Sequence, residues 1–313
     1  MRINFWGVCG SIPSPQTPSQ IRSKISAILE NITVDDLQSA ESKERFLAGL
    51  PPWLFGTVGG NSPCVTVTPD ASNDYFVFDC GSGLREMGMA VNRQNPRPEH
   101  FHIFFSHFHW DHLQGLPFFG PAYDPSKKID FYSPEPDFEK SLCGQMSPPY
   151  FPITMDNMNA NKTFHVLEGP VSIGQVSICY KKMNHPGDSF AYCLQEKSRR
   201  FIYATDTELT APDFIKNDEN SAFFQDADMI VIDCQYTLGE AIDKYNWGHS
   251  AFSLAVDFAA NWGIKHMVLF HHDPTHNDRK LYNILQSARW YLERMNIKGI
   301  ELSLATEGLE ISL

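Results

Sequence analysis

The sequence predicts an α/β protein, because apolar segments of strand length alternate with helical segments. Strands are predicted at residues 101–105, 229–233 and 265–270, each a mostly apolar run that ends in polar or turn-forming residues. A helix is predicted at residues 251–262, and an amphipathic helix at residues 278–295. Alternation of this kind favours sheets that are covered by helices.

In chain order, a strand is predicted at residues 2–9 and helical structure at residues 19–50, with a second short helix after Ser39 that Pro51 and Pro52 stop. Strands at residues 64–68 and 75–79 are close enough in sequence to form a hairpin. The other predicted elements are a short helix at residues 138–142 and strands at 128–132, 164–167, 171–180, 189–194, 200–204, 299–304 and 308–312.

The chain has no linker, repeat or low-complexity segment, so residues 1–313 are predicted to form one domain with a helical insert at about residues 14–58. The insert carries few chemical groups. It is interpreted as a lid, as an oligomer contact or as a surface addition.

Composition limits the classes of function. The net charge of −12 argues against broad capture of nucleic acid, which requires a basic face. No apolar run approaches the ~20 residues of a membrane span, and the N-terminus is predicted to be a strand and not a signal peptide. The seven cysteines are an odd number without a C-x-x-C pair, which favours reduced thiols and a cytoplasmic location.

The segment from Ser106 to His112 holds four side chains that can bind metal. His107 and His109 are two residues apart, so they point to the same side of an extended backbone. Asp111 and His112 follow after a turn and can face a neighbouring point, before a helix that is predicted to begin at residue 113. One loop could therefore supply two ligands to each of two cations, and these nitrogen and oxygen donors suit zinc, manganese or iron.

Other metal-capable residues also lie at or just past the ends of apolar strands. They are His185, Asp206, Asp233 and His271. A single aspartate at such a place is more often a turn former, and turn chemistry does not explain their joint placement. Asp79 ends another strand, where it can form a turn or orient a ligand histidine.

These residues resemble the metallo-β-lactamase superfamily of binuclear metal hydrolases. Within it, the chain looks like the phosphodiesterase branch, which includes the tRNA 3′-processing endonucleases and the phosphonate-pathway cyclic phosphodiesterase. The matching segments span nearly the whole chain: Gly7 to Ser11, Gly59 to Ser62, Phe78 to Gly81, Ser106 to His112, Asn184 to Pro186, Ala204 to Thr207, Gly248 to Ser250 and Leu269 to His271.

The resemblance implies a four-layer αββα sandwich of two mixed β-sheets, the metallo-β-lactamase fold. It implies two divalent metal ions, with zinc favoured over manganese or iron. The first ion would be bound by His107, His109 and His185. The second would be bound by Asp111, His112 and His271, and Asp206 would bridge the two ions.

The resemblance also implies a catalytic group beside the metals. His249 is the candidate general acid, and Asp111 belongs to the catalytic group as well as to the ligands. Asp233 lies where the endonucleases usually carry a longer glutamate behind this histidine. Ser250 is predicted to cap the helix that follows.

The leading hypothesis is a phosphodiesterase that acts on small or cyclic phosphodiesters. Nuclease action on RNA ends is an alternative, although nucleic acid is not favoured because the chain is acidic and lacks the long Gly/Lys-rich arm of the endonucleases. A non-catalytic sensor that binds metal or nucleotide is a further alternative. The expected partners are a small phosphodiester and a second copy of the chain in a homodimer, with no membrane.

Overall fold

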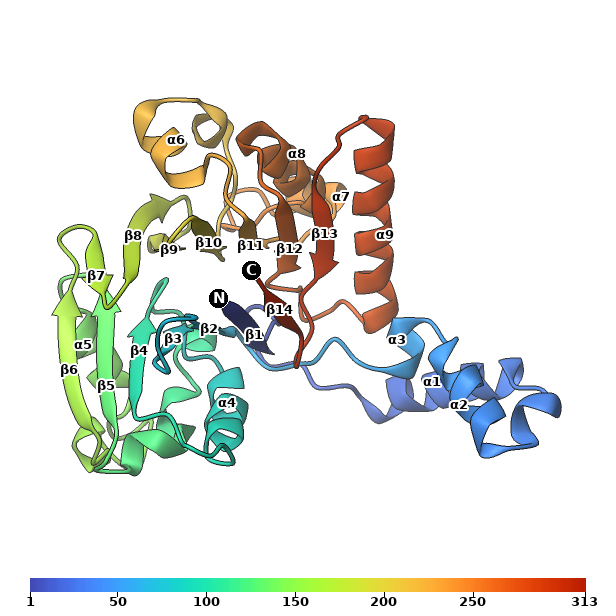
Figure 1. Cartoon of the computed structure of the whole chain (residues 1–313), viewed down its shortest axis with the longest axis horizontal. Coiled ribbons are helices and arrows are strands. Elements are labelled where there is room, and N and C mark those ends of the chain that lie inside the picture. The colour runs from blue at the N-terminus through green and yellow to red at the C-terminus, as the bar shows by residue number, and fades with distance from the viewer.

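The computed structural model describes residues 1–313 and contains two seven-stranded β-sheets. The first sheet has the order β14-β1-β2-β3-β4-β5-β6, and its strands β3 to β6 run parallel. The last strand of the chain pairs with the first, so the two termini lie close together (Figure 1). The strands are β1 (Arg2–Gly7), β2 (Cys64–Thr68), β3 (Tyr75–Phe78), β4 (His100–Phe104), β5 (Lys128–Ser133), β6 (Asn161–Val166) and β14 (Glu310–Ser312).

The second sheet has the order β13-β12-β11-β10-β9-β8-β7, with β10 to β13 parallel and the others antiparallel. Both sheets are therefore mixed. Its strands are β7 (Val171–Ile173), β8 (Val176–Met183), β9 (Ser189–Glu196), β10 (Arg199–Ala204), β11 (Met229–Asp233), β12 (His266–Phe270) and β13 (Glu301–Leu304).

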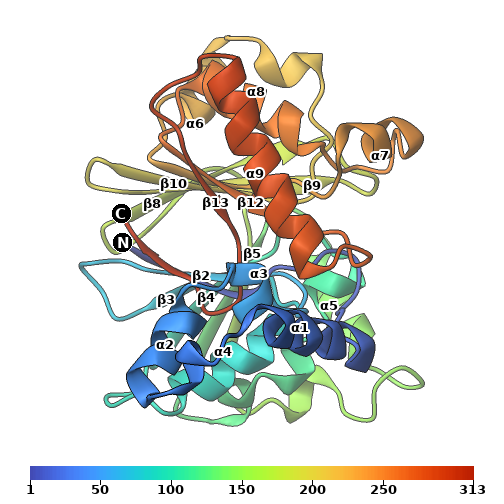
Figure 2. The same ribbon diagram turned by 90° about the vertical axis from the view of Figure 1, so that its right-hand side faces the viewer.

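Helices cover the outer face of each sheet, as Figure 2 shows. Helices α6 (Asp218–Phe224), α8 (Phe252–Trp262) and α9 (Asp278–Arg294) lie on the second sheet, while α4 (Gly83–Val91) and α5 (Phe138–Gln145) lie on the first. The predicted αββα sandwich, the metallo-β-lactamase fold, is thereby confirmed.

Aromatic side chains fill the space between the sheets. The ring of Phe78 on β3 lies 5.3 Å from that of Tyr203 on β10 and 5.9 Å from that of Tyr192 on β9, measured between centroids. All three side chains are fully buried. Truncating such a ring to alanine costs about 3–5 kcal/mol, so this contact fixes the two sheets against each other.

Parallel pairing decides where the chemical groups gather. Because β3 and β4 are parallel, as are β10, β11 and β12, the segments that follow these strands leave the sandwich at a common edge. Asp79, the histidine-rich segment, Asp206 and His271 all lie in those segments, and Asp233 is the last residue of β11. The fold therefore brings together donors that are far apart in sequence.

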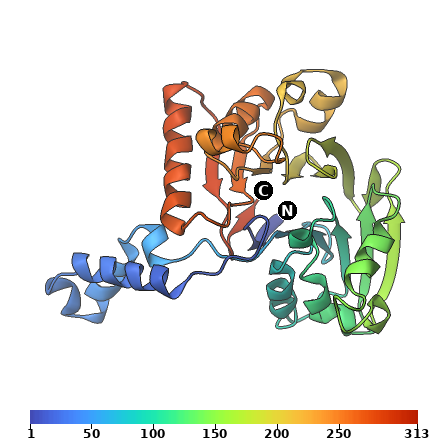
Figure 3. The same ribbon diagram turned by 180° about the vertical axis from the view of Figure 1, so that it is seen from behind.

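The helical insert extends away from both sheets (Figures 1 and 3). It contains α1 (Pro18–Asn31), α2 (Ala40–Ala48) and α3 (Pro52–Phe55), and capping boxes at Thr17 and Ser39 begin the first two helices. The second short helix that was predicted after Ser39 is confirmed as α2, which ends at Ala48, before Pro51 and Pro52. Pro52 begins the short helix α3, because proline is favoured at a first helical position.

Several local predictions were wrong. Residues after His112 form 3₁₀ turns and no α-helix, and the strand predicted at residues 171–180 is a β7–β8 hairpin that turns at Gly174. Helices α4, α6 and α7 (Leu238–Asp243) were not predicted. No helix has both the length and the apolar character needed to cross a membrane.

Candidate metal centre

The histidine-rich segment leaves β4 and turns once before it re-enters the protein. Trp110–His112 form a single 3₁₀ turn, and the backbone of His112 accepts a hydrogen bond from Cys80 N–H at 2.7 Å. His107 and His109 precede the turn, whereas Asp111 and His112 lie within it. The turn therefore sends the two pairs of side chains toward different neighbours, as the spacing predicts.

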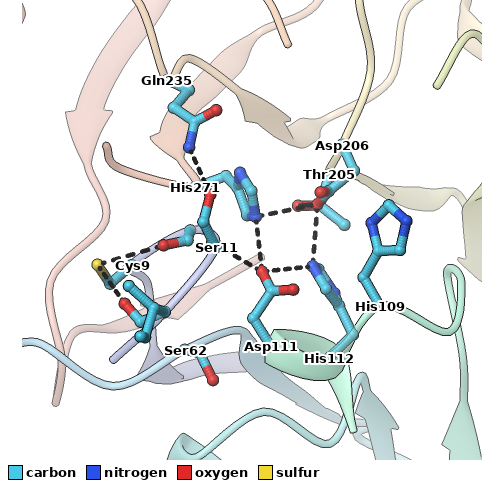
Figure 4. Close-up of polar contacts among 12 residues, drawn as sticks. Cys9, Ser11, Ser62, His109, Asp111, His112, Thr205, Asp206, Gln235 and His271 are labelled. Atoms are coloured by element: carbon cyan, nitrogen blue, oxygen red, sulfur yellow. Dashed lines mark hydrogen bonds and ion pairs between the residues drawn. The ribbon is translucent and has the colours of Figure 1, made fainter. Parts of the chain in front are cut away.

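Four side chains form the more closely spaced part of the cluster, which we call the aspartate half (Figure 4): Asp111, His112, Asp206 and His271. His112 Nε2 lies 3.1 Å from Asp111 Oδ2 and 3.2 Å from Asp206 Oδ2. His271 Nε2 lies 3.4 Å and 3.2 Å from the same two oxygens. Donor atoms around a tetrahedral zinc ion are about 3.4 Å apart, so the spacing fits one metal ion.

Three histidines form the other part, which we call the histidine half: His107, His109 and His185. Their donor atoms lie within 4.8 Å of one another, and His185 Nε2 is 3.2 Å from His109 Nδ1. His107 and His185 are buried, whereas His109 is exposed. The histidine half is thus the more open of the two.

Asp206 lies between the two halves. Its Oδ1 atom is 3.7 Å from His107 Nε2 and 3.9 Å from His185 Nε2, while its Oδ2 atom faces the aspartate half. The carboxylate can therefore supply one oxygen to each of two cations. This is the arrangement expected of a bridging ligand, and that role stays a prediction.

Three of the strand-end residues have left-handed backbone conformations. The φ angles are 61° at Asp79, 49° at Asp206 and 60° at His271. Non-glycine residues adopt such angles infrequently, at a cost of about 1–3 kcal/mol when the conformation is strained. Three candidate site residues thus share an infrequent backbone conformation, which supports the view that function constrains where their side chains point.

The residues fit divalent cations. His107 Nε2 is a buried nitrogen without a hydrogen-bond partner, and leaving such an atom unpaired costs about 1–3 kcal/mol. Burial alone would raise the pKa of Asp206, but the facing imidazoles of His271 and His112 lower it well below its ordinary value. An ionised carboxylate and free imidazole lone pairs are the donors that zinc, manganese and iron accept.

Asp79 holds both ends of the histidine-rich segment in place, at Ser106 and at His112. Its Oδ2 atom lies 2.8 Å from His112 Nδ1 and accepts hydrogen bonds from the Ser106 and Tyr203 hydroxyls at 2.7 and 2.8 Å. Its Oδ1 atom accepts the Ser106 N–H at 2.8 Å. Contact with Nδ1 leaves Nε2 of His112 directed toward the aspartate half, which is how carboxylates orient ligand histidines.

His249 and Asp233 form a close pair beside both halves. His249 Nδ1 lies 2.7 Å from Asp233 Oδ2, and the ring of His249 is 5.2 Å from that of His185 and 4.9 Å from that of His271. Burial lowers the pKa of His249, but the carboxylates of Asp233, Asp206 and Asp111 together raise it, with Asp233 contributing most, and the net pKa is raised. The shorter Asp233 therefore does reach the histidine.

Ser250 does not cap α8, contrary to the prediction. Its hydroxyl donates to the Thr207 carbonyl at 2.6 Å, and its N–H donates to Asp233 Oδ1 at 2.9 Å. Ala251 occupies the cap position without a side-chain bond. Ser250 instead anchors the segment that carries His249.

The centre is also contacted by two residues that the sequence did not predict to lie there. The N–H of Ser11 donates to Asp111 Oδ2 at 2.8 Å, and a Cβ atom at Gly10 would lie 2.5 Å from His271 Cε1. Only glycine fits at this approach. Both residues belong to the Gly7 to Ser11 segment, which matched the family pattern without an assigned role. His272 is separate from the centre, since its Nε2 lies 2.9 Å from the Ala305 carbonyl.

The centre opens into a surface hollow of about 480 Å³, which His249, Asp206 and His271 help to line. Phe108 and Trp110 line the same hollow and also a neighbouring groove. That groove measures about 870 Å³, and its aromatic residues are Phe108, Trp110, Phe118, Tyr150 and Phe151. A substrate at the centre would therefore have an aromatic surface beside it.

Known proteins are similar to this chain in sequence and in fold. Residues 74–272 match the family described as the beta-lactamase superfamily domain, which is more than half of the chain. A Ribonuclease Z of Prochlorococcus marinus is 22% identical over 274 residues, covering 70% of this chain and 84% of its own length.

Two solved structures have the same fold over nearly their whole length. The short form of human tRNase Z has a TM-score of 0.63 at 18% identity, covering 100% of this chain and 99% of that protein. A diphosphatase of the PhnP family has a TM-score of 0.62 at 15% identity, covering 100% and 97%. At these identities, the likeness establishes the fold.

Proposed function

This chain belongs to the beta-lactamase superfamily, and we propose that it is a metal-dependent phosphodiesterase that acts on small or cyclic phosphodiesters. Family membership and the donor geometry support a metal-dependent hydrolase. The choice of a phosphodiester rests on the chemical groups that surround the candidate metals.

The observation that carries the proposal is the His249–Asp233 pair beside the two halves. Cleavage of a phosphodiester produces an alkoxide that needs a proton, which a positioned histidine can donate. Asp233 contacts Nδ1 at 2.7 Å, so Nε2 is the nitrogen left to deliver a proton into the hollow that His249 lines. The raised pKa of His249 favours the protonated ring that this step requires.

The aspartate and histidine halves are proposed to hold two divalent ions, with zinc favoured. Bound there, such ions would polarise a phosphoryl oxygen and lower the pKa of water into the neutral range. Asp206 would fix their separation, and Asp79 would hold the His112 ring in the ligating orientation.

The aromatic groove favours a phosphodiester that carries a flat group. A nucleobase can stack on exposed rings for about 1–3 kcal/mol, and Trp110 and Phe118 are both exposed in the groove. The net charge of −12 does not prevent a small anion from binding, since bound cations reverse the local field. We therefore propose nucleotide-like diesters as the first compounds to test.

Purified protein loaded with Zn²⁺ or Mn²⁺ is expected to hydrolyse bis-p-nitrophenyl phosphate and a member of a panel of cyclic nucleotides. His249→Ala is expected to keep its metal content and to lose on the order of 10²–10⁴ in turnover, the usual contribution of a general acid. His165→Ala on β6, outside the centre, is the matched control. Absence of turnover with every diester in metal-loaded protein would reject the proposal, and tight nucleotide binding without turnover would favour a sensor.

Nuclease action on RNA ends is the second candidate, because curated relatives are named Ribonuclease Z. Against it, the projecting helical insert is not basic, with four lysine or arginine residues against five acidic ones in residues 18–55. Phosphate contacts normally require lysine and arginine. A gel assay with precursor tRNA separates the two, since cleavage at a defined 3′ position would favour the nuclease.

We also propose a cytoplasmic location and a homodimer. All seven cysteines are free thiols, and Cys179 on β8 and Cys193 on β9 lie opposite each other without forming a disulfide bond. Thiols of this kind persist in a reducing compartment. Sedimentation of the purified chain would test the dimer.

A further inference from the structure

A second cluster of histidines and carboxylates lies at the other ends of the same strands. His100 and His102 begin β4, two residues apart and therefore on one face. His102 pairs with Asp130 on β5, and Asp74 directly precedes β3. The candidate metal centre follows the other end of β4, about 13 Å from His100 along the strand, and shares none of these residues, so the two clusters are separate.

Three residues of this cluster place donor atoms close together. The metal-capable atoms of Asp74, His100 and His102 lie within 4.8 Å of one another. His102 Nε2 is 3.9 Å from Asp74 Oδ2, and the two imidazole centroids are 3.9 Å apart. Donors around tetrahedral zinc are about 3.4 Å apart, so a modest inward movement of Asp74 would complete this geometry.

In each histidine, one ring nitrogen contacts a neighbouring polar side chain, and the other ring nitrogen remains available to bind a metal ion. His100 Nε2 lies 2.7 Å from Asp130 Oδ2, and His102 Nδ1 lies 3.1 Å from the Tyr132 hydroxyl. Ligand histidines are typically anchored in this way through the nitrogen that does not bind metal. Lys128 Nζ lies 2.9 Å from the same Asp130 oxygen, so Asp130 is neutralised and is suited to orient His100 and not to bind metal itself.

His102 gives a second, independent indication that this cluster binds an ion. Its Nε2 atom is buried without a hydrogen-bond partner, and the side chain is 3% exposed. Burial lowers the pKa of His102 to about 4, with His100 adding to the effect, so the ring is neutral at neutral pH. A neutral, unpaired and buried nitrogen that faces a carboxylate at 3.9 Å is a costly arrangement unless something binds it.

We propose that Asp74, His100 and His102 bind a third divalent cation, of the zinc type, apart from the candidate metal centre. Two imidazoles and one carboxylate suit zinc, and three protein ligands leave one position for water. Asp74 and His100 are partly exposed, which gives an ion a path from solvent. The ion would join the start of β3 to the start of β4 and stabilise that end of the first sheet.

The test is metal analysis of the full chain after loading with Zn²⁺ and desalting. The wild type is expected to retain one more zinc per chain than the Asp74→Asn/His100→Gln double variant. His165→Gln is the matched control, because its Nε2 is also near Asp130, at 3.5 Å, but it lies outside the three-residue set. Zinc is further expected to raise Tm in the wild type more than in the double variant.

Equal zinc content in the wild type and the folded double variant would overturn the proposal, as would an equal loss in His165→Gln. His102→Gln serves as a second variant if the double variant does not fold, and it is expected to lose the same single zinc. Because the readout is the difference of one ion, it does not depend on turnover. Loss of that ion with hydrolysis retained would place it outside the catalytic centre.

Discussion

The aspartate half and the histidine half of the candidate metal centre each take two donors from one loop, yet they differ in donor spacing and burial. In the aspartate half, donor distances lie between 3.1 and 3.4 Å and every side chain is buried. In the histidine half the distances from the shared Asp206 are 3.7 and 3.9 Å, and His109 is exposed. The comparison shows that the aspartate half is the more closely spaced and the more buried of the two.

The difference follows from the elements that carry each donor. Asp206 and His271 follow parallel strands that are buried on both faces, and Asp79 fixes His112. His185 instead lies in the β8–β9 connection, and His109 lies in the loop before the 3₁₀ turn. Donors on sheet ends are held by the core, whereas donors on loops keep more freedom.

Replacing the shared residue is expected to have the largest effect. Asp206→Asn removes a charge from both halves, so the loss of several kcal/mol of charge stabilisation predicts a decrease in kcat/KM on the order of 10³-fold or more. Metal content should fall in both halves. Asp226→Asn, at an exposed aspartate that is also left-handed, is the control. Two retained ions with activity within tenfold of the wild type would show that Asp206 bridges nothing.

Chelation should separate the two halves in time. The exposed His109 predicts that the ion of the histidine half leaves first, so metal content against time with a chelator should fall in two phases. His109→Ala should remove the first phase and leave the second unchanged. Loss of both ions in a single phase would show that the difference in burial between the halves does not affect how fast each ion leaves.

Loss of the Asp79 carboxylate should weaken only the aspartate half. Removing a carboxylate that orients a ligand histidine costs about 10–100-fold in metal affinity, and Asp79→Asn is expected to lose this much for one of two ions. Tyr203→Phe removes one of the hydrogen bonds to Asp79 and should have a smaller effect. Competition with a zinc indicator measures both. Equal weakening of the two ions would show that Asp79 supports the fold as a whole.

The smallest expected effect is a shift in the pH profile. Activity that requires protonated His249 is complete below the pKa of that group and falls as pH rises through it. Asp233 raises this pKa, so Asp233→Asn should move the alkaline limb to lower pH. The measurement is kcat against pH for both proteins. An unchanged limb would remove His249 as the group that titrates.

Much of the fold was accessible from the sequence because strand and helix periods are local. The predicted strands at residues 64–68, 200–204 and 229–233 agree with the observed ones within one residue. The helix predicted after His112 does not form: a Cβ atom at Gly115 would lie 1.9 Å from the Gly81 carbonyl oxygen, and 3₁₀ turns flank this close approach. Such packing is not encoded in the local pattern.

Residue type and spacing along the chain are enough to identify the donors and to place them at strand ends. Which donors meet depends on the parallel pairing of β10 to β12 and on the close approach of the two sheets, and both arise from contacts between residues distant in sequence. The same contacts place Gly10 against His271 and gather Asp74, His100 and His102, and local spacing signals neither arrangement.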